Sequence, residues 1–264
     1  MPNFDTPEPI TAEVDLAVGT VQINAGDRAD TNVEVHPRDP AKDADVRAAE
    51  EIRVEFAGDS LLVQDPGTTG LGRLLRKGVV DVTIDLPAGS RLQAETRDAG
   101  IRCEGRLGTA RVTASSGNIT LDRLAGNAEI TSTHGRVRVQ EIDGTAAVRT
   151  SNGAITLGTV TGRLRANSAH GDVAVERALS SVTARTAHGS VRIGEVVRGE
   201  VDLETSYGEV EVGIREGTAA WLDTGSKHGS TTSSLEAAED PGPAEETVEV
   251  RARSTYGDIV VRRA

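Results

Sequence analysis

The sequence predicts an all-β fold, a parallel β-solenoid in which a single chain coils into stacked rungs of two short strands each. Three observations predict it. Glycines recur every 18 residues through the middle of the 264-residue chain, and short runs of alternating aliphatic residues lie between them. Aromatic residues make up 2% of the chain, so the core must be thin and built from small aliphatic side chains instead of large rings.

The internal repeat sets the length of one rung. Apolar and polar residues alternate twice within each unit, for example over 146–150 and again over 155–157, and such alternation indicates half-buried strands. One unit cannot bury its apolar face alone, whereas units stacked at roughly 4.8 Å can. An antiparallel propeller would instead need a repeat near ~40 residues. The marker glycines are Gly117, Gly135, Gly153, Gly171 and Gly189, followed less regularly by Gly208, Gly229 and Gly257.

The sequence indicates one continuous domain whose middle part has a regular repeat. We expect irregular rungs and a cap over residues 1–96, and the regular solenoid, wound right-handed, over 97–230. An acidic surface loop over 231–247 and a final rung over 248–264 follow.

The first region contains two local elements and a loop. Alternation over 52–63 around a Gly-Asp pair predicts a hairpin, and Asp39 is placed to cap a short helical turn that ends near Glu51. Residues 66–78 mix glycines with basic and apolar residues but lack the Gly-Lys-Ser/Thr ending of a phosphate-binding loop. We interpret them as a flap that caps the solenoid or contacts a partner. Its candidate partner-binding residues are Leu71, Arg73, Leu74, Leu75, Arg76 and Lys77.

Histidine recurs just before the marker glycines, where four of the five histidines of the chain lie. Asn and His tolerate left-handed backbone conformations, and X-Gly pairs favour tight turns, so we interpret this column as structural corners. The alternative is a metal site at His170 and His188, which would be neighbours about 4.8 Å apart. The sequence otherwise offers no catalytic, cofactor-binding or metal-binding residues. The column consists of Ser116, His134, Asn152, His170, His188, Tyr207, His228 and Tyr256.

Small residues, mostly with hydroxyl groups, form a further column three positions before the glycines. By alternation these side chains point inward, where a hydroxyl can bond to corner backbone groups that would otherwise be buried and unpaired. The column consists of Ala114, Ser132, Thr150, Ser168, Thr186, Thr205, Ser226 and Ser254.

Charge and hydropathy exclude several classes of protein. A net charge of −12 argues against nucleic-acid binding, which needs a basic surface, and no run approaches the ~20 apolar residues of a membrane span. The first residues lack the basic and apolar segments of a secretory signal, so we expect a cytoplasmic protein. The single cysteine, Cys103, alternates with Ile101, which predicts a buried small side chain instead of a nucleophile.

Three segments, "VDVTIDLPAGSRLQAETRDAGIRCEG", "TSNGAITL" and "RSTYGDIVVRR", resemble a large bacterial family of β-strand-repeat proteins. The family is described as putative adhesins or toast-rack domains of unknown function, and the resemblance covers roughly residues 10–264. It implies a β-solenoid fold and, in some members, the sensing of cell-envelope stress and the binding of cationic antimicrobial peptides. It implies no catalytic residues.

These observations favour a non-enzymatic interaction scaffold, a monomer or small homo-oligomer, that binds a protein or a cationic peptide through electrostatic steering. Two alternatives stay open. A carbohydrate-active solenoid enzyme would need two carboxylates about 5–9 Å apart, and acids meet on the outward positions only at Asp202/Glu204 and Glu209/Glu211. A self-assembling structural protein would join copies through the unpaired strand edges of its terminal rungs.

Overall fold

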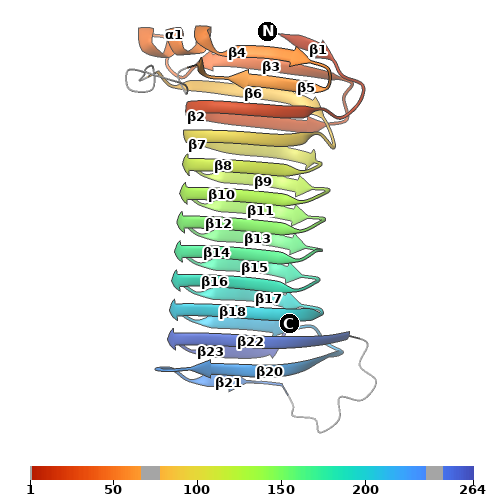
Figure 1. Cartoon of the computed structure of the whole chain (residues 1–264), viewed down its shortest axis with the longest axis vertical. Helices are drawn as coiled ribbons and strands as arrows, with labels where there is room; N and C mark the ends of the chain where they lie inside the picture. The colour runs from red at the N-terminus through yellow and green to blue at the C-terminus, as the bar shows by residue number, and fades with distance from the viewer. Residues whose placement is uncertain (1, 67–77, 236–245) are drawn as a thin grey trace. The chain divides into compact units, whose positions relative to one another are not determined.

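The computed structural model describes residues 2–66, 78–235 and 246–264, and the chain forms two compact units, Met1–Gly135 and Arg136–Ala264. Parallel strands dominate each unit, as the sequence predicts (Figure 1). The two units are described in turn.

The parallel strands of the first unit stack on two long strands, β2 (Thr11–Gly26) and β7 (Arg91–Leu107). Each spans a whole rung: the two halves of β2 pair with β5 (Ser60–Gln64) and β6 (Val80–Pro87), and its full length pairs with β7. On the other side of β7 lie β8 (Ala110–Ser116) and β9 (Ile119–Leu124), and β10 (Ala128–His134) pairs with β8. Ala128 pairs with Ala110, so the 18-residue repeat is the rung.

Antiparallel strands cap the first unit. β1 (Asn3–Asp5) pairs with β3 (Asp30–Pro37), β3 with β6, and β4 (Arg53–Ala57) with β5. The expected hairpin is therefore confirmed as β4–β5. Residues 1–96 therefore hold β2, the parallel strands β5 and β6 that pair with its two halves, and a cap of antiparallel strands, β1, β3 and β4.

The single helix of the described residues, α1 (Asp43–Glu51), begins later than expected. Its N-cap residue is Lys42, and no side chain caps it, so the expected cap at Asp39 is wrong. Asp39 lies upstream, where its carboxylate accepts the Ala41 N–H instead. Asp45 in the first helical turn is buried and accepts the N–H groups of Asp39 and Val79, which ties the helix to the chain just after β3 and just before β6.

The second unit is the regular solenoid. β11 (Val137–Ile142), β13 (Ile155–Val160), β15 (Val173–Ala178), β17 (Val191–Val196) and β19 (Val210–Ile214) pair in parallel along one face. β12 (Ala146–Asn152), β14 (Leu164–His170), β16 (Val182–His188) and β18 (Gly199–Tyr207) do so along another. The right-handed winding stays a prediction.

The rungs at the end of the second unit are not stacked in the order of the sequence. β22 (Glu246–Tyr256) pairs with β18 on one side and with β20 (Thr218–Ser226) on the other. Likewise β23 (Ile259–Arg263) pairs with both β19 and β21 (Thr231–Ser233). The segment expected to form the final rung therefore lies between two earlier ones, and β20–β21 form the outer rung (Figure 1).

Side-chain polarity explains this order. Three inward positions of β22–β23 hold Ala252, Ile259 and Val261, which are all buried, whereas the equivalent positions of β20–β21 hold Thr224, Thr231 and Ser233. A buried hydroxyl without a partner destabilises the fold, so the apolar rung takes the inner place and the polar rung the outer one.

The inward hydroxyl column is confirmed over most of its length in the second unit. Its members donate to the carbonyl oxygen of the corner glycine one rung away, over 2.8–3.3 Å. Ser132 and Thr150 are buried but have no hydrogen-bond partner among the described residues. The five that bond are Ser168, Thr186, Thr205, Ser226 and Ser254.

Candidate functional site

The residue before each corner glycine lies outside the barrel of the second unit, although the alternation would place it inside. Thr186 is buried, yet His188, two residues on, is exposed. The strand ends at His188, and Gly189 then turns the corner with a φ of +144°. The turn swings the last side chain of the strand out into solvent, where the equivalent residues of neighbouring rungs meet it.

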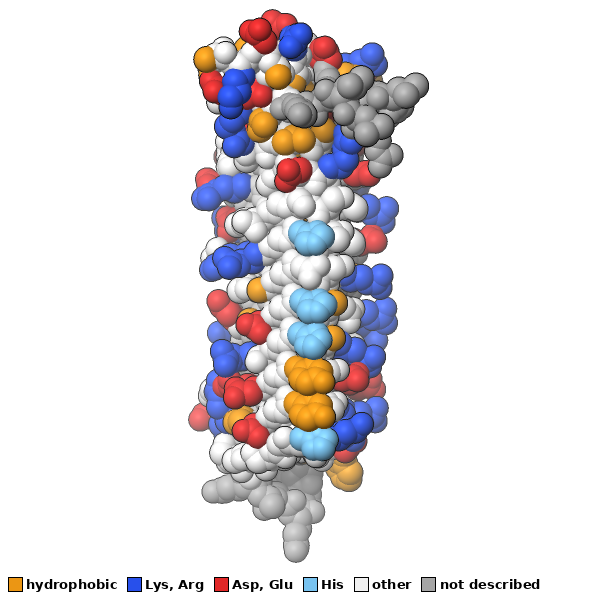
Figure 2. Space-filling view, turned by 90° about the vertical axis from the view of Figure 1, so that its left-hand side faces the viewer, with side chains coloured by type: hydrophobic (Ala, Val, Ile, Leu, Met, Phe, Trp, Pro, Cys, Tyr) orange, Lys and Arg blue, Asp and Glu red, His pale blue; other side chains and the backbone are white. Residues whose placement is uncertain are grey.

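In the second unit these side chains form a continuous stack of rings, here called the ring column. His170 stacks on His188, His188 on Tyr207 and Tyr207 on Tyr256, with 4.9 Å between centroids and 7–8° between ring planes. His228 closes the stack on Tyr256 at 4.6 Å and 12°. Figure 2 shows this column of side chains on the side of the second unit that faces the viewer. Tyr207 is 51% exposed and Tyr256 46%, so the edges of the rings face solvent.

The reason that the sequence suggested for this column is wrong. We expected residues that tolerate left-handed backbone, but none of the described non-glycine residues has a positive φ. The glycine itself takes that conformation: at Gly171 φ is +142°, and a Cβ would lie 2.3 Å from the Gly153 carbonyl oxygen. The preceding residue is extended, so the column lies at the corners but serves as a stack of rings. Asn152, which pairs with His170, continues the column without a ring, and His134 belongs to the first unit.

His170 and His188 do not have the geometry of a metal site. Their ring planes are almost parallel and their centroids are 4.9 Å apart, so their nitrogen lone pairs run side by side and do not converge. Two Zn–N bonds of about 2.0–2.1 Å cannot bridge that separation. Among residues 2–66, 78–235 and 246–264, no group of three or more possible metal ligands occurs.

A row of acidic and hydroxyl side chains runs beside the ring column, at the start of each second strand. Asp172 accepts the N–H of Ser190 at 2.8 Å. Asp258 accepts both the N–H and the hydroxyl of Ser230 at 2.8 and 2.9 Å, and these bonds lower the pKa of Asp258. The row, here called the acidic row, consists of Asp172, Ser190, Glu209, Asp258 and Ser230, and Figure 2 shows acidic side chains beside the rings.

On the other side of the column, acids and arginines neutralise one another. Arg185 pairs with Asp202 at 2.6 Å and with Glu204 at 3.6 Å, and Arg253 pairs with Asp223 at 2.7 Å. The ring column therefore lies between a net negative row and a side of paired charges.

Three of the four carboxylates considered for a glycosidase, Asp202, Glu204 and Glu211, form ion pairs with arginine. Asp202 and Glu204 share Arg185. Glu211 bridges Arg192 and Arg262 at 2.5 and 2.8 Å, and hydrogen bonds from Arg262 above all hold its pKa below its usual range. A general acid needs a raised pKa, and the shift of Glu211 has the opposite direction.

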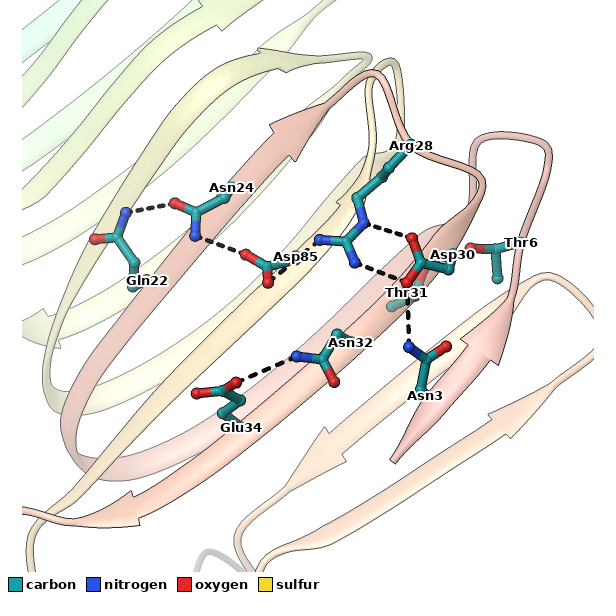
Figure 3. A network of polar contacts seen from close by, with 10 residues as sticks. All are labelled: Asn3, Thr6, Gln22, Asn24, Arg28, Asp30, Thr31, Asn32, Glu34 and Asp85. Atoms are coloured by element: carbon teal, nitrogen blue, oxygen red, sulfur yellow. Dashed lines mark hydrogen bonds and ion pairs between the residues drawn. The ribbon is translucent and has the colours of Figure 1, made fainter. Parts of the chain in front are cut away.

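A second polar cluster, in the cap of the first unit, was not found from the sequence. Arg28 holds Asp30 through two bonds of 2.8 and 2.9 Å and Asp85 at 3.2 Å, and Asn3 and Asn24 add amide bonds to the same two carboxylates (Figure 3). The hydrogen bond from Arg28 is the main reason that the pKa of Asp30 is lowered. The carboxylates and amides of this cluster come from β1, β2, β3 and β6, and Arg28 lies between β2 and β3, so the cluster ties the antiparallel cap to the parallel stack.

The remaining sequence-derived candidates fall into two groups. Leu71, Arg73, Leu74, Leu75, Arg76 and Lys77 lie outside the described residues. Cys103 is 2% exposed, which confirms its predicted burial, and desolvation raises the pKa of its thiol to about 12. Trp221 on the outer rung is 73% exposed.

The fold and the ring column together define a parallel β-solenoid with one exposed aromatic edge. A family model described as Toastrack DUF4097 matches residues 12–262, and the chain belongs to this family. The resemblance inferred from the corner motifs is thereby confirmed.

The solved structures to which the chain is similar have low sequence identity to it. A "putative adhesin" from Bacteroides fragilis is 11% identical with a TM-score of 0.50, and the match covers 98% of this chain and 95% of that one. A "putative adhesin" from Parabacteroides distasonis is 10% identical with a TM-score of 0.39, over the same shares of the two chains. No curated protein matches the chain in sequence. The described part of the chain contains no helix with the length and apolar character that a membrane crossing requires.

Proposed function

We propose that the protein is a non-enzymatic interaction scaffold that binds a protein or a cationic peptide along the ring column and the acidic row. One observation carries this proposal. Both tyrosines of a chain with 2% aromatic residues lie in one exposed column and stack there with three histidines. Rings are scarce in this protein, and these five contribute little to its core. Exposed aromatic side chains are typical of binding surfaces.

The stack is preorganised for binding. Four of its rings stand at the last position of a strand that pairs with its neighbours, and each ring contacts the next. Because these side chains are already held in place, a partner that docks there has to fix few more of them, and this reduces the entropic cost of association.

The orientation of the rings favours a peptide over a sugar. Inside the column both faces of each ring contact a neighbouring ring, so a ligand meets ring edges, phenol hydroxyls and imidazole nitrogens. Carbohydrate platforms need a free ring face, whereas a peptide can use hydrogen bonds to the edges.

Charge favours a cationic partner. Three carboxylates of the acidic row, Asp172, Glu209 and Asp258, lie within the five rungs of the ring column. A basic ligand would be attracted by this row, and its affinity would fall with ionic strength because exposed charges are screened within about 8–10 Å.

The arginine-bound state of Asp202, Glu204 and Glu211 supports a binding role over glycoside hydrolysis. The family resemblance suggests an envelope-stress or regulatory context for that binding. The cytoplasmic location stays a prediction.

The test is a titration with a basic peptide in which Lys and Leu alternate, against the same peptide with Gln in place of Lys. The variant Tyr207→Ala/Tyr256→Ala removes the centre of the ring column, and Glu209→Gln removes one charge of the acidic row. Trp221→Ala is the matched control, because it removes an exposed aromatic residue that lies outside the column.

We expect calorimetric binding of the Lys peptide that weakens with added salt, is lost in the double tyrosine variant and is kept in Trp221→Ala. Circular dichroism would verify that each variant is folded. Equal binding of the Lys peptide by the wild type and the double tyrosine variant, or no binding at low salt, would contradict the proposal.

A further inference from the structure

The out-of-order rung occupies a space that is here called the slot. Its two walls are β18–β19 and β20–β21, which belong to one continuous stretch joined by the short turn over residues 215–217. The last rung, β22–β23, fills the slot and pairs with both walls. Its chain connection to the walls runs through residues 234–245.

Within the described part of the chain, the hydrogen bonds, ion pairs and ring contacts that join the last rung to other elements are made with a wall or with the chain next to it. Arg253 pairs with Asp223 of β20 at 2.7 Å, and Arg262 pairs with Glu211 of β19 at 2.8 Å. Tyr256 stacks between Tyr207 and His228. None of these contacts depends on which molecule supplies the rung, so the last rung of a second copy would fit the slot equally well.

The walls can also close on each other when the slot is empty. The last rung aligns Tyr207 with Tyr256 and Ser254 with Ser226, so direct contact between the walls would bring His228 onto Tyr207 and Ser226 onto Thr205. The ring and hydroxyl columns stay in register in both arrangements, so the departure of the last rung need not leave the walls without partners.

We propose that the last rung exchanges between copies of this chain: residues 246–264 of one molecule fill the slot of a second, which produces an interlocked dimer. Ten residues, 236–245, separate Leu235 from Glu246, and such a connection reaches at most roughly 36–40 Å. A swapped rung makes the same contacts between two molecules that it makes within one. The equilibrium between monomer and dimer therefore depends on the protein concentration and on the length of the connection. This inference goes beyond the proposed function and does not depend on it.

The experiment uses single cysteines at outward positions that face each other across adjacent rungs. Glu204 on β18 pairs with Arg253 on β22, and Arg185 on β16 pairs with Glu204. Glu204→Cys and Arg253→Cys are placed in separate full-length proteins with different affinity tags, each with Cys103→Ala. The matched control combines Arg185→Cys with Glu204→Cys, whose rungs follow each other in the sequence and have no slot between them.

The two proteins are mixed in the folded state, or unfolded in urea and refolded together, and then oxidised gently. We expect a disulfide-linked species that carries both tags and has twice the mass of one chain from the Glu204→Cys and Arg253→Cys mixture. Its yield should rise with protein concentration, and the control mixture should give no such species.

Two results would overturn the inference. One is the absence of the two-tag species after co-refolding. This result counts if a single chain with both substitutions, Glu204→Cys/Arg253→Cys, forms its internal disulfide, because that disulfide shows that the two positions are close enough to react. The other is equal yields from the test and control mixtures, which would indicate random collision.

Discussion

The inward hydroxyl column predicts that the same substitution, Thr→Val, changes the free energy of unfolding differently at two sites of the second unit. Thr205 is buried and donates from its hydroxyl to the Gly189 carbonyl oxygen at 2.8 Å. Thr150 holds the same place in its own rung and is also buried, but its hydroxyl has no partner among the described residues. Thr→Val replaces the hydroxyl with a methyl group of similar size at both positions.

The expected magnitudes follow from that difference. Thr205→Val removes a made hydrogen bond and leaves the carbonyl without its hydroxyl donor, a loss of about 1–3 kcal/mol. Thr150→Val removes a buried, unpaired hydroxyl, a change that is neutral or stabilises by about 1–3 kcal/mol. The two variants should therefore differ by at least about 1 kcal/mol in the free energy of unfolding.

Urea unfolding followed by far-ultraviolet circular dichroism would measure the difference. Fluorescence of Trp221, the single tryptophan of the chain, would report separately on the outer rung. If Thr150→Val destabilised the protein as much as Thr205→Val, the hydroxyl column would not act through its bonds to the glycine carbonyls, and the reasoning would be refuted.

Three further predictions concern single positions. Gly171→Ala should prevent a stable second unit, because the new Cβ would lie 2.3 Å from a carbonyl oxygen. Gly58 has a φ of +65° and open space around it, so Gly58→Ala should lower the free energy of unfolding by only about 1–2 kcal/mol. Thermal unfolding of the two variants would measure the difference. Cys103, whose pKa is raised to about 12, should resist thiol reagents at pH 8 until urea unfolds the protein, and rapid labelling of the folded protein would contradict its burial. Because the pKa of Glu211 is lowered in the folded state from its ordinary value of 4.5, its contribution to stability is present above that value and is lost as the pH falls through its folded pKa. Glu211→Gln should therefore make stability less dependent on pH below about 4.5, and unchanged acid unfolding curves would exclude the effect.

The rung was predictable because two independent signals coincide in it. Alternating residues such as Val148 and Leu157 define the buried face, and the glycine at each corner marks a position where a side chain would collide with the adjacent rung. The order of the last rungs was harder to predict from the sequence, because Val201, Leu222 and Val250 fit the same inward column in either order. The signal that could have settled it lies in Thr231 and Ser233, whose polarity is unsuited to an inner rung.

The ring column was predicted at the right residues but for the wrong reason. Asn and His are compatible with a tight turn, and this led to an explanation based on backbone conformation alone. Tyr207 and Tyr256 in the same column are not turn residues, and their shared place just before a corner glycine is the sequence signal for stacking. The cap cluster around Arg28 could not be found this way, since its members lie in strands that pair outside the repeat.

The ring column also links the two proposals. A partner that spans Tyr207, Tyr256 and His228 would contact β18, the last rung and the chain between β20 and β21, so it binds the filled slot more tightly than the empty one. By linkage, such a partner must oppose release of the last rung. The filled slot presents the same rings whether the rung comes from the same chain or from a second copy, so the partner does not select between monomer and dimer. Its effect should be on the rate: a saturating basic peptide should slow the formation of the two-tag species from folded proteins without changing its final yield.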